Sequence, residues 1–279
     1  MEQLEQSKDD QPFQHQSRKD RVISWTSRTL CDHLTYTVRR GLLKGMKRKG
    51  GLAWLPEWLL GDGETREHKF FRELDLTGKI VFDVGAFEGL VALFFAQHAR
   101  QVVCYEPNAR NYGRLKENLQ LNHIENVTVR RFGLGSTPGS SDMVWDPSRA
   151  GSSTIGSTSM ASTIAARKSA HHERIEITTL DTEVFENGLP VPEFIKIDIE
   201  GYELPALQGA RRLLQTAHPT LYVEMHGETM NEKRRNARAV LEFLAECGYR
   251  SIIHVETGQA VGAGNSEVAA QGHLYARQK

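Results

Sequence analysis

The sequence predicts an α/β protein in which helices cover both faces of a mostly parallel sheet. From about residue 76 onward, short apolar runs alternate with amphipathic segments, which is the order that successive βαβ units produce. Two of the earliest apolar runs end in carboxylates, Asp83 and Glu106, at the edge of an open sheet where ligands bind. Hydrophobic residues make up 39% of the 279, which is enough for a buried core.

The first half of the predicted sheet contains three strands that are joined through helices. The expected order is a strand at 79–83, a helix at 89–100, a strand at 101–106, a helix at 108–121 and a strand at 127–132. Leu115 and Leu119 lie four positions apart and therefore share the face of their helix that would pack on the sheet. Strands connected in this way run parallel.

The second half of the predicted sheet follows after a break in the pattern. Strands are expected at 174–180, 194–199 and 220–225, helices at 204–214 and 232–247, and a last pair of strands at 249–255 and 273–276. Gly248 is a suitable residue to end the long helix. The last two strands are expected to form an antiparallel pair that completes the sheet.

The chain is expected to begin with a basic extension at residues 1–50, which carry a net charge of +5. Residues 1–20 are polar and predicted to be disordered, whereas 22–43 show helical spacing of apolar residues. The basic run at 44–50 is expected to be a solvated linker, with contact to phosphates or an anionic surface as the alternative.

Residues 51–279 are predicted to form the main domain, which is interrupted by an insertion at about 135–169. This insertion is rich in Ser, Thr and Gly and is expected to be a loop or flexible segment outside the core. Loops of this length are either functional lids or disordered, and both alternatives stay open here.

The composition disfavours several classes of protein. The formal net charge is zero, which argues against a protein that binds nucleic acid through bulk charge. The three cysteines, Cys31, Cys104 and Cys247, are too far apart for a zinc ribbon or a disulfide scaffold. Residues 1–20 lack the apolar stretch of a secretory signal, and no apolar run approaches the roughly 20 residues that span a bilayer. We therefore expect a soluble, cytoplasmic protein without a transmembrane segment.

The turn after the first strand indicates what kind of ligand would bind at this end of the sheet. Its spacing is Asp83-x-Gly85-x-x-x-Gly89, and Gly85 would allow a tight turn and close approach of a ligand. The glycine pattern of a pyrophosphate loop is absent, which disfavours the alternative of an NAD domain. Asp83 and Glu88 instead favour a ligand that carries a cation, such as the ammonium group of an amino acid.

The end of the second strand points to a nucleoside. A carboxylate in the position of Glu106 can accept both hydroxyls of a ribose, and Asn108 can cap the helix that follows. The adenine is expected near Phe132 and Gly133, at the end of the third strand. A nucleoside that carries a sulfonium and an amino acid meets these demands, and S-adenosylmethionine is such a molecule.

Several segments together resemble the FkbM family of S-adenosylmethionine-dependent methyltransferases. The resemblance covers about residues 76–249 and is carried by five motifs, at 82–86, 105–108, 179–181, 195–203 and 223–224. The most specific is Lys-Ile-Asp-Ile-Glu-Gly-x-Glu, at 196–203. Where the family usually has Asn in the first turn, this sequence has Phe87.

The resemblance implies a Rossmann-like class I methyltransferase fold with a seven-stranded sheet. It also implies O-methylation of a hydroxyl on a sugar or a small natural product. The residues expected to bind the cofactor, from the motifs and the strand ends, are Asp83, Gly85, Ala86, Gly89, Glu106, Asn108, Phe132 and Gly133.

Catalytic residues are expected at the ends of the later central strands. Asp198 would lie beside the methyl group or the acceptor hydroxyl with Glu200 close by, and Lys196 would keep Asp198 ionised. His226 has the pKa of a general base or could bind the substrate. A metal is not expected, although Asp198 and Glu224 could hold a divalent cation as a weaker alternative. Glu203 is expected to support a helix.

Two other functions stay open. The basic residues at 39–49 could guide a methyltransferase to RNA, although the aromatic and basic interleaving of RNA-binding segments is missing. The chain could also be a catalytically silent relative that binds a ligand or partner only. The sequence does not indicate the oligomeric state.

Overall fold

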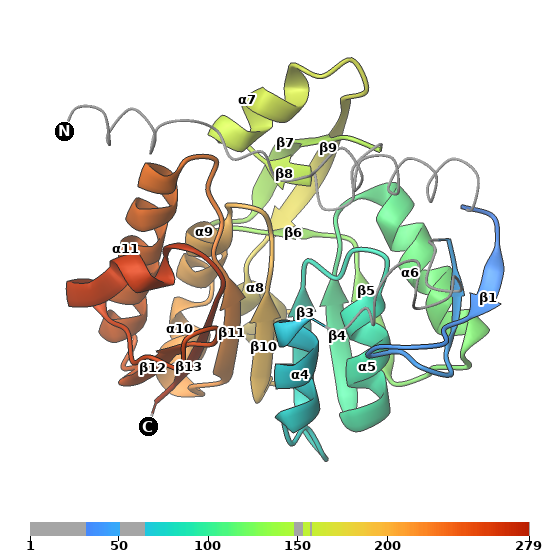
Figure 1. Ribbon diagram of the computed structural model, residues 1–279, viewed down its shortest axis with the longest axis horizontal. Helices are drawn as coiled ribbons and strands as arrows, with labels where there is room; N and C mark the ends of the chain where they lie inside the picture. Colours follow the sequence, from blue (N-terminus) through green and yellow to red (C-terminus); the bar gives the residue numbers. More distant parts are fainter. Residues whose placement is uncertain (1–31, 51–64, 148–152, 157, 279) are drawn as a thin grey trace.

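The computed structural model describes residues 32–50, 65–147, 153–156 and 158–278. The predictions of disorder at 1–20 and of the first part of a helix at 22–31 lie outside these residues. Figure 1 shows a central sheet between helices, with a smaller sheet above one of its ends.

The central sheet has seven strands and is mostly parallel, as predicted. Their order across the sheet is β12-β13-β11-β10-β3-β4-β5. In chain order the strands are β3 (Ile80–Val84), β4 (Gln101–Tyr105), β5 (Val127–Arg130), β10 (Phe194–Ile197), β11 (Thr220–Glu224), β12 (Ser251–His254) and β13 (His273–Arg277). Only β13 runs antiparallel to its neighbours, which confirms the predicted final antiparallel pair.

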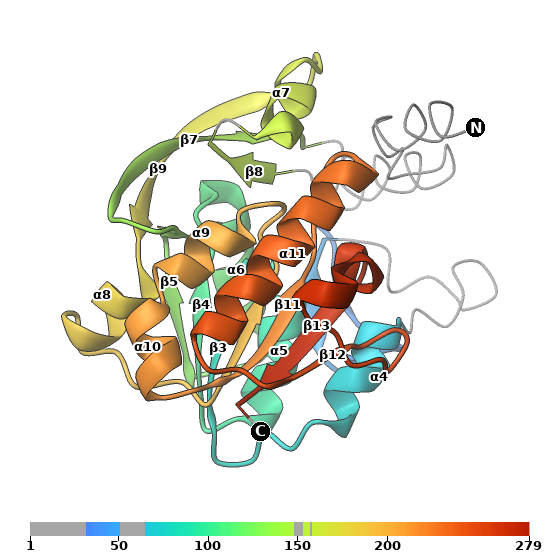
Figure 2. The ribbon, with the colours of Figure 1, turned by 90° about the vertical axis from the view of Figure 1, so that its left-hand side faces the viewer.

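The central strands carry apolar side chains on both faces, and helices cover both faces of the sheet. Successive residues of β3 alternate between two apolar clusters: Val81 contacts one and Phe82 the other. The Val81 side is covered by α4 (Arg66–Glu73), α5 (Leu90–His98) and α6 (Ala109–Leu121). The Phe82 side is covered by α8 (Leu180–Phe185), α9 (Glu203–Gln208), α10 (Arg211–Thr216) and α11 (Met230–Glu246). Figure 2 shows α9, α10 and α11 on one side of the sheet and α4 and α5 on the other.

The predicted loop at 135–169 instead contains two strands and a helix, so that prediction was wrong for the parts of the segment that they form. A second sheet has the order β6-β9-β7-β8, formed by β6 (Gly133–Leu134), β7 (Gly139–Trp145), β8 (Ser153–Ile155) and β9 (His171–Thr178). The helix α7 (Ser159–Ala165) lies between β8 and β9 in the chain. We call β7, β8 and α7 the insert.

The insert folds because it pairs with a segment that was predicted as a strand of the main sheet. β9 hydrogen-bonds to β7 over the whole length of β7 and takes no part in the central sheet. Met143, Ile155, Ile175 and Ile177 are buried together and form a small core of their own. These four residues come from three strands, β7, β8 and β9, so the spacing within one segment did not reveal the core.

The predicted helix at 22–43 is also wrong over its described part. Residues 32–43 contain β1 (Thr35–Thr37), which pairs with β2 (Lys47–Lys49) as an antiparallel hairpin. Gly41 and Gly45 have φ of 69° and 92°, a left-handed conformation that ends any helix between the two strands.

The basic run at 44–50 is therefore part of a hairpin and not a solvated linker. The backbone N–H groups of Lys47 and Lys49 donate to Asn122 and Asn118 on α6. Two of its cations form ion pairs, Arg48 with Glu88 and Lys49 with Glu117.

Candidate active site

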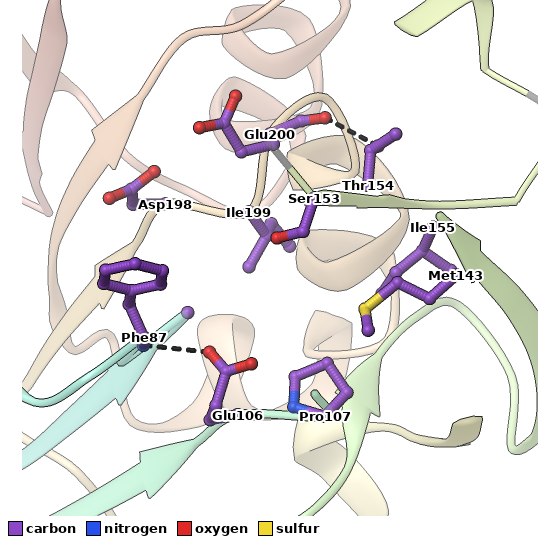
Figure 3. A pocket seen from close by; sticks show the side chains of 11 residues that line it. Phe87, Glu106, Pro107, Met143, Ser153, Thr154, Ile155, Asp198, Ile199 and Glu200 are labelled. Carbon is purple, nitrogen blue, oxygen red and sulfur yellow. Dashed lines mark hydrogen bonds between the residues drawn. The ribbon is translucent and has the colours of Figure 1, made fainter. Parts of the chain in front are cut away.

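A cavity of about 180 Å³ lies at the carboxyl ends of β3, β4 and β10, on the side of the central sheet that faces the insert. Its lining residues are Gly85, Phe87, Glu106, Pro107, Met143, Ser153, Thr154, Ile155, Asp198, Ile199 and Glu200. Figure 3 shows three groups around it: Glu106 and Pro107, Asp198 and Glu200 opposite them, and Met143 with Ile155 from the insert. The cavity is thus built by the central sheet and bounded on one side by the insert.

The turn after β3 is packed directly against the end of β10. Gly85 has φ of 79°, and a Cβ on it would lie 1.9 Å from the backbone oxygen of Asp198. Only glycine is compatible with this approach. Two residues on, Phe87 has φ of 50°, a left-handed conformation that is uncommon for a bulky side chain. The turn presents the Phe87 N–H to the next strand, where it donates to Glu106 Oε2 at 2.9 Å.

Glu106 is a buried carboxylate held by backbone and side-chain donors. Besides the Phe87 N–H, it accepts hydrogen bonds at Oε1 from the Asn108 N–H at 3.0 Å and from Asn111 Nδ2 at 3.4 Å. Burial raises the pKa of Glu106 to about 7, although the N–H donors of Asn108 and Phe87 act to lower it. A carboxylate that is oriented in this way and lines a cavity can accept the hydroxyls of a ribose.

Asp83 is placed behind the cavity and does not line it. Its side chain is fully buried, and neither of its oxygens has a hydrogen-bond partner among the described residues. Burial raises its pKa, whereas Lys196, whose Nζ lies 3.6 Å from Asp83 Oδ1, acts to lower it. Asp83 is therefore connected to the cavity through Lys196, which also donates to Asp198 Oδ2 at 3.0 Å.

Asp198 and Glu200 reach the cavity from the loop after β10. Glu200 has φ of 53°, and its backbone oxygen accepts a hydrogen bond from the Thr154 hydroxyl of the insert at 2.8 Å. Burial raises the pKa of Glu200 to about 8, with further contributions from the neighbouring carboxylates and an opposing one from His226. Such a group can take up a proton near neutral pH.

His226 follows β11 and lies beside these carboxylates without lining the cavity. Its Nδ1 is 2.8 Å from Glu203 Oε1, and its Nε2 is 3.8 Å from Asp198 Oδ1 and 3.7 Å from Glu200 Oε2. Burial acts to lower the pKa of His226, but Glu200, Glu203 and Glu224 together raise it well above the usual value. Glu203 thus contacts a predicted catalytic residue, in addition to beginning α9 as expected.

Glu224 connects this group to a second pair that the sequence did not point to. Glu224 Oε1 is 3.6 Å from His226 Nε2, and Oε2 is 3.5 Å from His273 Nε2. His273 in turn forms an ion pair with Glu256 at 2.5 Å. Burial acts to raise the pKa of Glu224, but the hydrogen bond from His273 and the charge of His226 lower it to about 2. No motif pointed to His273, because it lies near the end of the chain in the antiparallel strand β13.

Other residues predicted to bind the cofactor are near the cavity but have structural contacts. Gly89 caps α5, and a Cβ on it would meet Leu115. Ala86 is buried in the apolar cluster beneath the turn. Asn108 caps α6 by accepting from the Asn111 N–H.

The predicted adenine residues lie away from the cavity lining. Gly133 belongs to β6, and a Cβ on it would meet Ile155, Ile175 and Ile177. Phe132 packs against the main core beneath the Arg130 guanidinium, 5.1 Å from its ring centroid. Met143 and Ile155 supply the apolar wall instead, and the sequence did not predict them because the insert carries no motif.

The residues present fit S-adenosylmethionine. Glu106 offers a buried carboxylate for a ribose, the glycine turn leaves room beside it, and Asp198 supplies negative charge for a cationic sulfonium. The seven-stranded sheet with one reversed strand and this cavity at the strand ends define a Rossmann-like protein of the class I methyltransferase type.

Comparison with known proteins identifies the family. Residues 83–251 match the family model of the methyltransferase FkbM domain, and the chain belongs to this family, as the motifs predicted. S-adenosylmethionine is the methyl donor that the family implies.

The chain is similar to a curated relative and to solved structures. It is 29% identical over 148 residues to the hexuronic acid methyltransferase AglP of Haloferax volcanii, which covers 53% of this chain and 56% of the relative. The structure of the methyltransferase FkbM from Methylobacillus flagellatus KT aligns with a TM-score of 0.47 and 18% identity, over 76% of this chain and 50% of that one. The putative methyltransferase SMU.1697c of Streptococcus mutans aligns with a TM-score of 0.41 and 12% identity, over 75% and 93%. The chain thus spans about half the length of the curated relative. Among the described residues, no helix is long and apolar enough to cross a membrane.

Proposed function

We propose that this chain is an S-adenosylmethionine-dependent O-methyltransferase whose acceptor is a hydroxyl of a sugar or glycan. The observation that carries the proposal is the cavity that places Glu106, for a ribose, opposite Asp198 and Glu200, for an acceptor. The similarity to a protein named as a hexuronic acid methyltransferase supports a sugar as the acceptor.

The donor, when bound, supplies an electrophilic methyl group on a sulfonium. Glu106 would hold its ribose through the lone pairs not already used by the Phe87 and Asn108 N–H groups. The residues around the cavity then position the acceptor oxygen in line with the methyl carbon, which is the main source of rate in such a transfer.

Glu200 is the proposed proton acceptor. With the donor bound, the acceptor oxygen would take the methyl group as the carbon–sulfur bond breaks, and Glu200 would accept the hydroxyl proton. Glu200 is better placed for this step than His226 because it lines the cavity, and its pKa of about 8 suits proton transfer near neutral pH. Asp198, held by Lys196 at 3.0 Å, keeps the acceptor side of the cavity negative.

The nucleic-acid alternative has less support. Arg48 and Lys49 of the basic run are paired with acidic side chains of the same chain, which reduces the charge they offer to phosphates.

The test is methyl transfer from labelled S-adenosylmethionine to methyl glycosides of hexuronic acids and of neutral hexoses, followed by mass spectrometry of the product. The Glu200→Gln variant should lose about 10²- to 10⁴-fold in kcat while it still binds S-adenosylhomocysteine. The control variant, Glu242→Gln, changes an exposed carboxylate on α11 and should keep full activity. Cofactor binding without transfer to any hydroxyl would favour the silent relative.

A further inference from the structure

Beside the cavity, two carboxylate oxygens and one histidine nitrogen point toward one another. Asp198, Glu224 and His226 each offer one ligand atom, and these atoms all lie within 4.8 Å of one another. We propose that they form a binding site for one divalent cation, with Mn²⁺ as the ion that suits two carboxylates and one imidazole.

Each of the three side chains is fixed through its other polar atom. Asp198 Oδ2 accepts from Lys196 at 3.0 Å, which leaves Oδ1 directed toward the site. Glu224 Oε2 faces His273 at 3.5 Å, which leaves Oε1. Outer partners that orient the ligands in this way are typical of metal sites.

The histidine supplies the observation that points to a ligand. The ring of His226 is buried, with 9% of the residue exposed, and its Nδ1 is bound to Glu203 at 2.8 Å. The contact with Glu203 orients the ring so that Nε2 faces the carboxylates of the site, an arrangement typical of histidine ligands held by an outer carboxylate. Nε2 makes no hydrogen bond to the described residues, and its nearest carboxylate oxygens lie at 3.6 to 3.8 Å.

The charges around His226 Nε2 favour a cation at the centre of the group. Three carboxylate oxygens, from Asp198, Glu200 and Glu224, face His226 Nε2, and a divalent cation among them would reduce their mutual repulsion. All three separations from Nε2 exceed the 3.2 Å typical of a direct hydrogen bond, which leaves space for an ion between these atoms.

The separations suit a shared ion after small side-chain rotations. Ligands at right angles around an ion lie about 3 to 3.5 Å apart for bonds of about 2.1 to 2.5 Å. Asp198 and Glu224 have 29% and 33% of their side chains exposed, which leaves them room to rotate toward His226.

The site also explains how the acceptor could be activated, a role that rests on the proposed function. Asp198 lines the cavity, so a cation on it would contact an acceptor oxygen and make its hydroxyl more acidic. Vicinal hydroxyls of a sugar, or a hydroxyl beside a carboxylate, could occupy two positions of the same ion. Glu200 remains free to take the proton.

The test is titration of the chelator-treated full chain with MnCl₂, followed by calorimetry and by the loss of the free Mn²⁺ signal in electron paramagnetic resonance. The wild type and the Glu242→Gln control should bind one ion per chain. Glu224→Gln, which removes one ligand and keeps its shape, should bind at least tenfold more weakly.

A parallel titration with S-adenosylhomocysteine separates this proposal from the proposed function and reports folding. If Glu224→Gln no longer binds S-adenosylhomocysteine, its fold is in question and the Asp198→Asn variant is titrated in its place. That variant should also bind Mn²⁺ at least tenfold more weakly than the wild type. The cation site would be overturned if the wild type did not bind Mn²⁺ at millimolar concentration. It would also be overturned if the folded variants bound Mn²⁺ as tightly as the wild type. If the same samples still bound S-adenosylhomocysteine, the proposed function would be unaffected.

Discussion

Glu106 allows a quantitative test of how the cofactor is held. In Glu106→Gln, one oxygen is replaced by an NH₂ group that faces N–H donors of Phe87, Asn108 or Asn111. The hydrogen bond from a ribose hydroxyl to a charged acceptor is also lost, at a cost of about 1.5 to 3 kcal/mol. We therefore expect the Kd of S-adenosylhomocysteine to rise about 10- to 150-fold, measured by calorimetry.

The pH dependence of binding provides an independent check on the same residue. Because burial raises the pKa of Glu106 to about 7, its carboxylate is about one tenth ionised at pH 6 and nine tenths ionised at pH 8. If the ionised form binds the ribose, wild-type affinity for S-adenosylhomocysteine should rise about tenfold over this range. The ligand lacks the sulfonium charge, so Glu200 contributes little to the change.

The same raised pKa gives the opposite sign for the stability of the ligand-free protein. The unfolded chain loses the Glu106 proton near the usual glutamate pKa of 4.5 and the folded protein only near 7, so stability falls as pH rises between these values. Glu106→Gln should remove both the pH dependence of binding and this contribution to stability. An affinity of the wild type that stays constant from pH 6 to 8, or a variant within twofold of it, would refute the role of Glu106.

Two further predictions concern stability. Gly85→Ala places a Cβ 1.9 Å from the Asp198 oxygen in a left-handed conformation, so it should cost more than about 2 kcal/mol and lower Tm by about 4 to 8 °C or more. The control is Gly113→Ala, which lies within α6 with nothing near the added carbon and should be neutral or stabilise the protein by up to about 1 kcal/mol. An unchanged Tm for Gly85→Ala would contradict the argument. Arg130→Met removes two hydrogen bonds, at 2.7 and 3.0 Å, from the fully buried carboxylate of Glu183. Arg130→Met should lower the free energy of unfolding, measured in urea, by about 3 kcal/mol. Adding Glu183→Gln to the same chain should restore part of this loss of stability. If the losses of the two substitutions simply added, the pairing of Arg130 with Glu183 would be contradicted.

Much of the central domain could be predicted because its signals are local. The strands at β3, β4, β10 and β11 are apolar runs bounded by turn residues, and the helices between them have apolar residues at helical spacing. Gly85, Glu106, Asp198 and Glu200 were predicted from the strand ends, the turns that follow them and the family motifs, and all four line the cavity. They could be found because the carboxyl ends of parallel strands meet at one edge of a sheet.

The hairpin at β1 and β2 and the insert were missed because their stability is not local. Residues 32–43 have apolar spacing that also suits a helix, and the alternative depends on two glycines and on contacts with α6. The insert is poor in apolar residues, and its small core forms only when Met143 and Ile155 meet Ile175 and Ile177 of β9.

The sequence by itself thus determined the class of fold, the family and the carboxylates at the ends of the central strands. Only the tertiary structure decided that Glu203 binds His226, that Glu224 lies between two histidines, and that the insert lines the cavity. The physical reason is that periodicity and turn chemistry act between near neighbours in the chain. Hydrogen bonds between separate strands depend on their register and order in the sheet, which no single segment encodes.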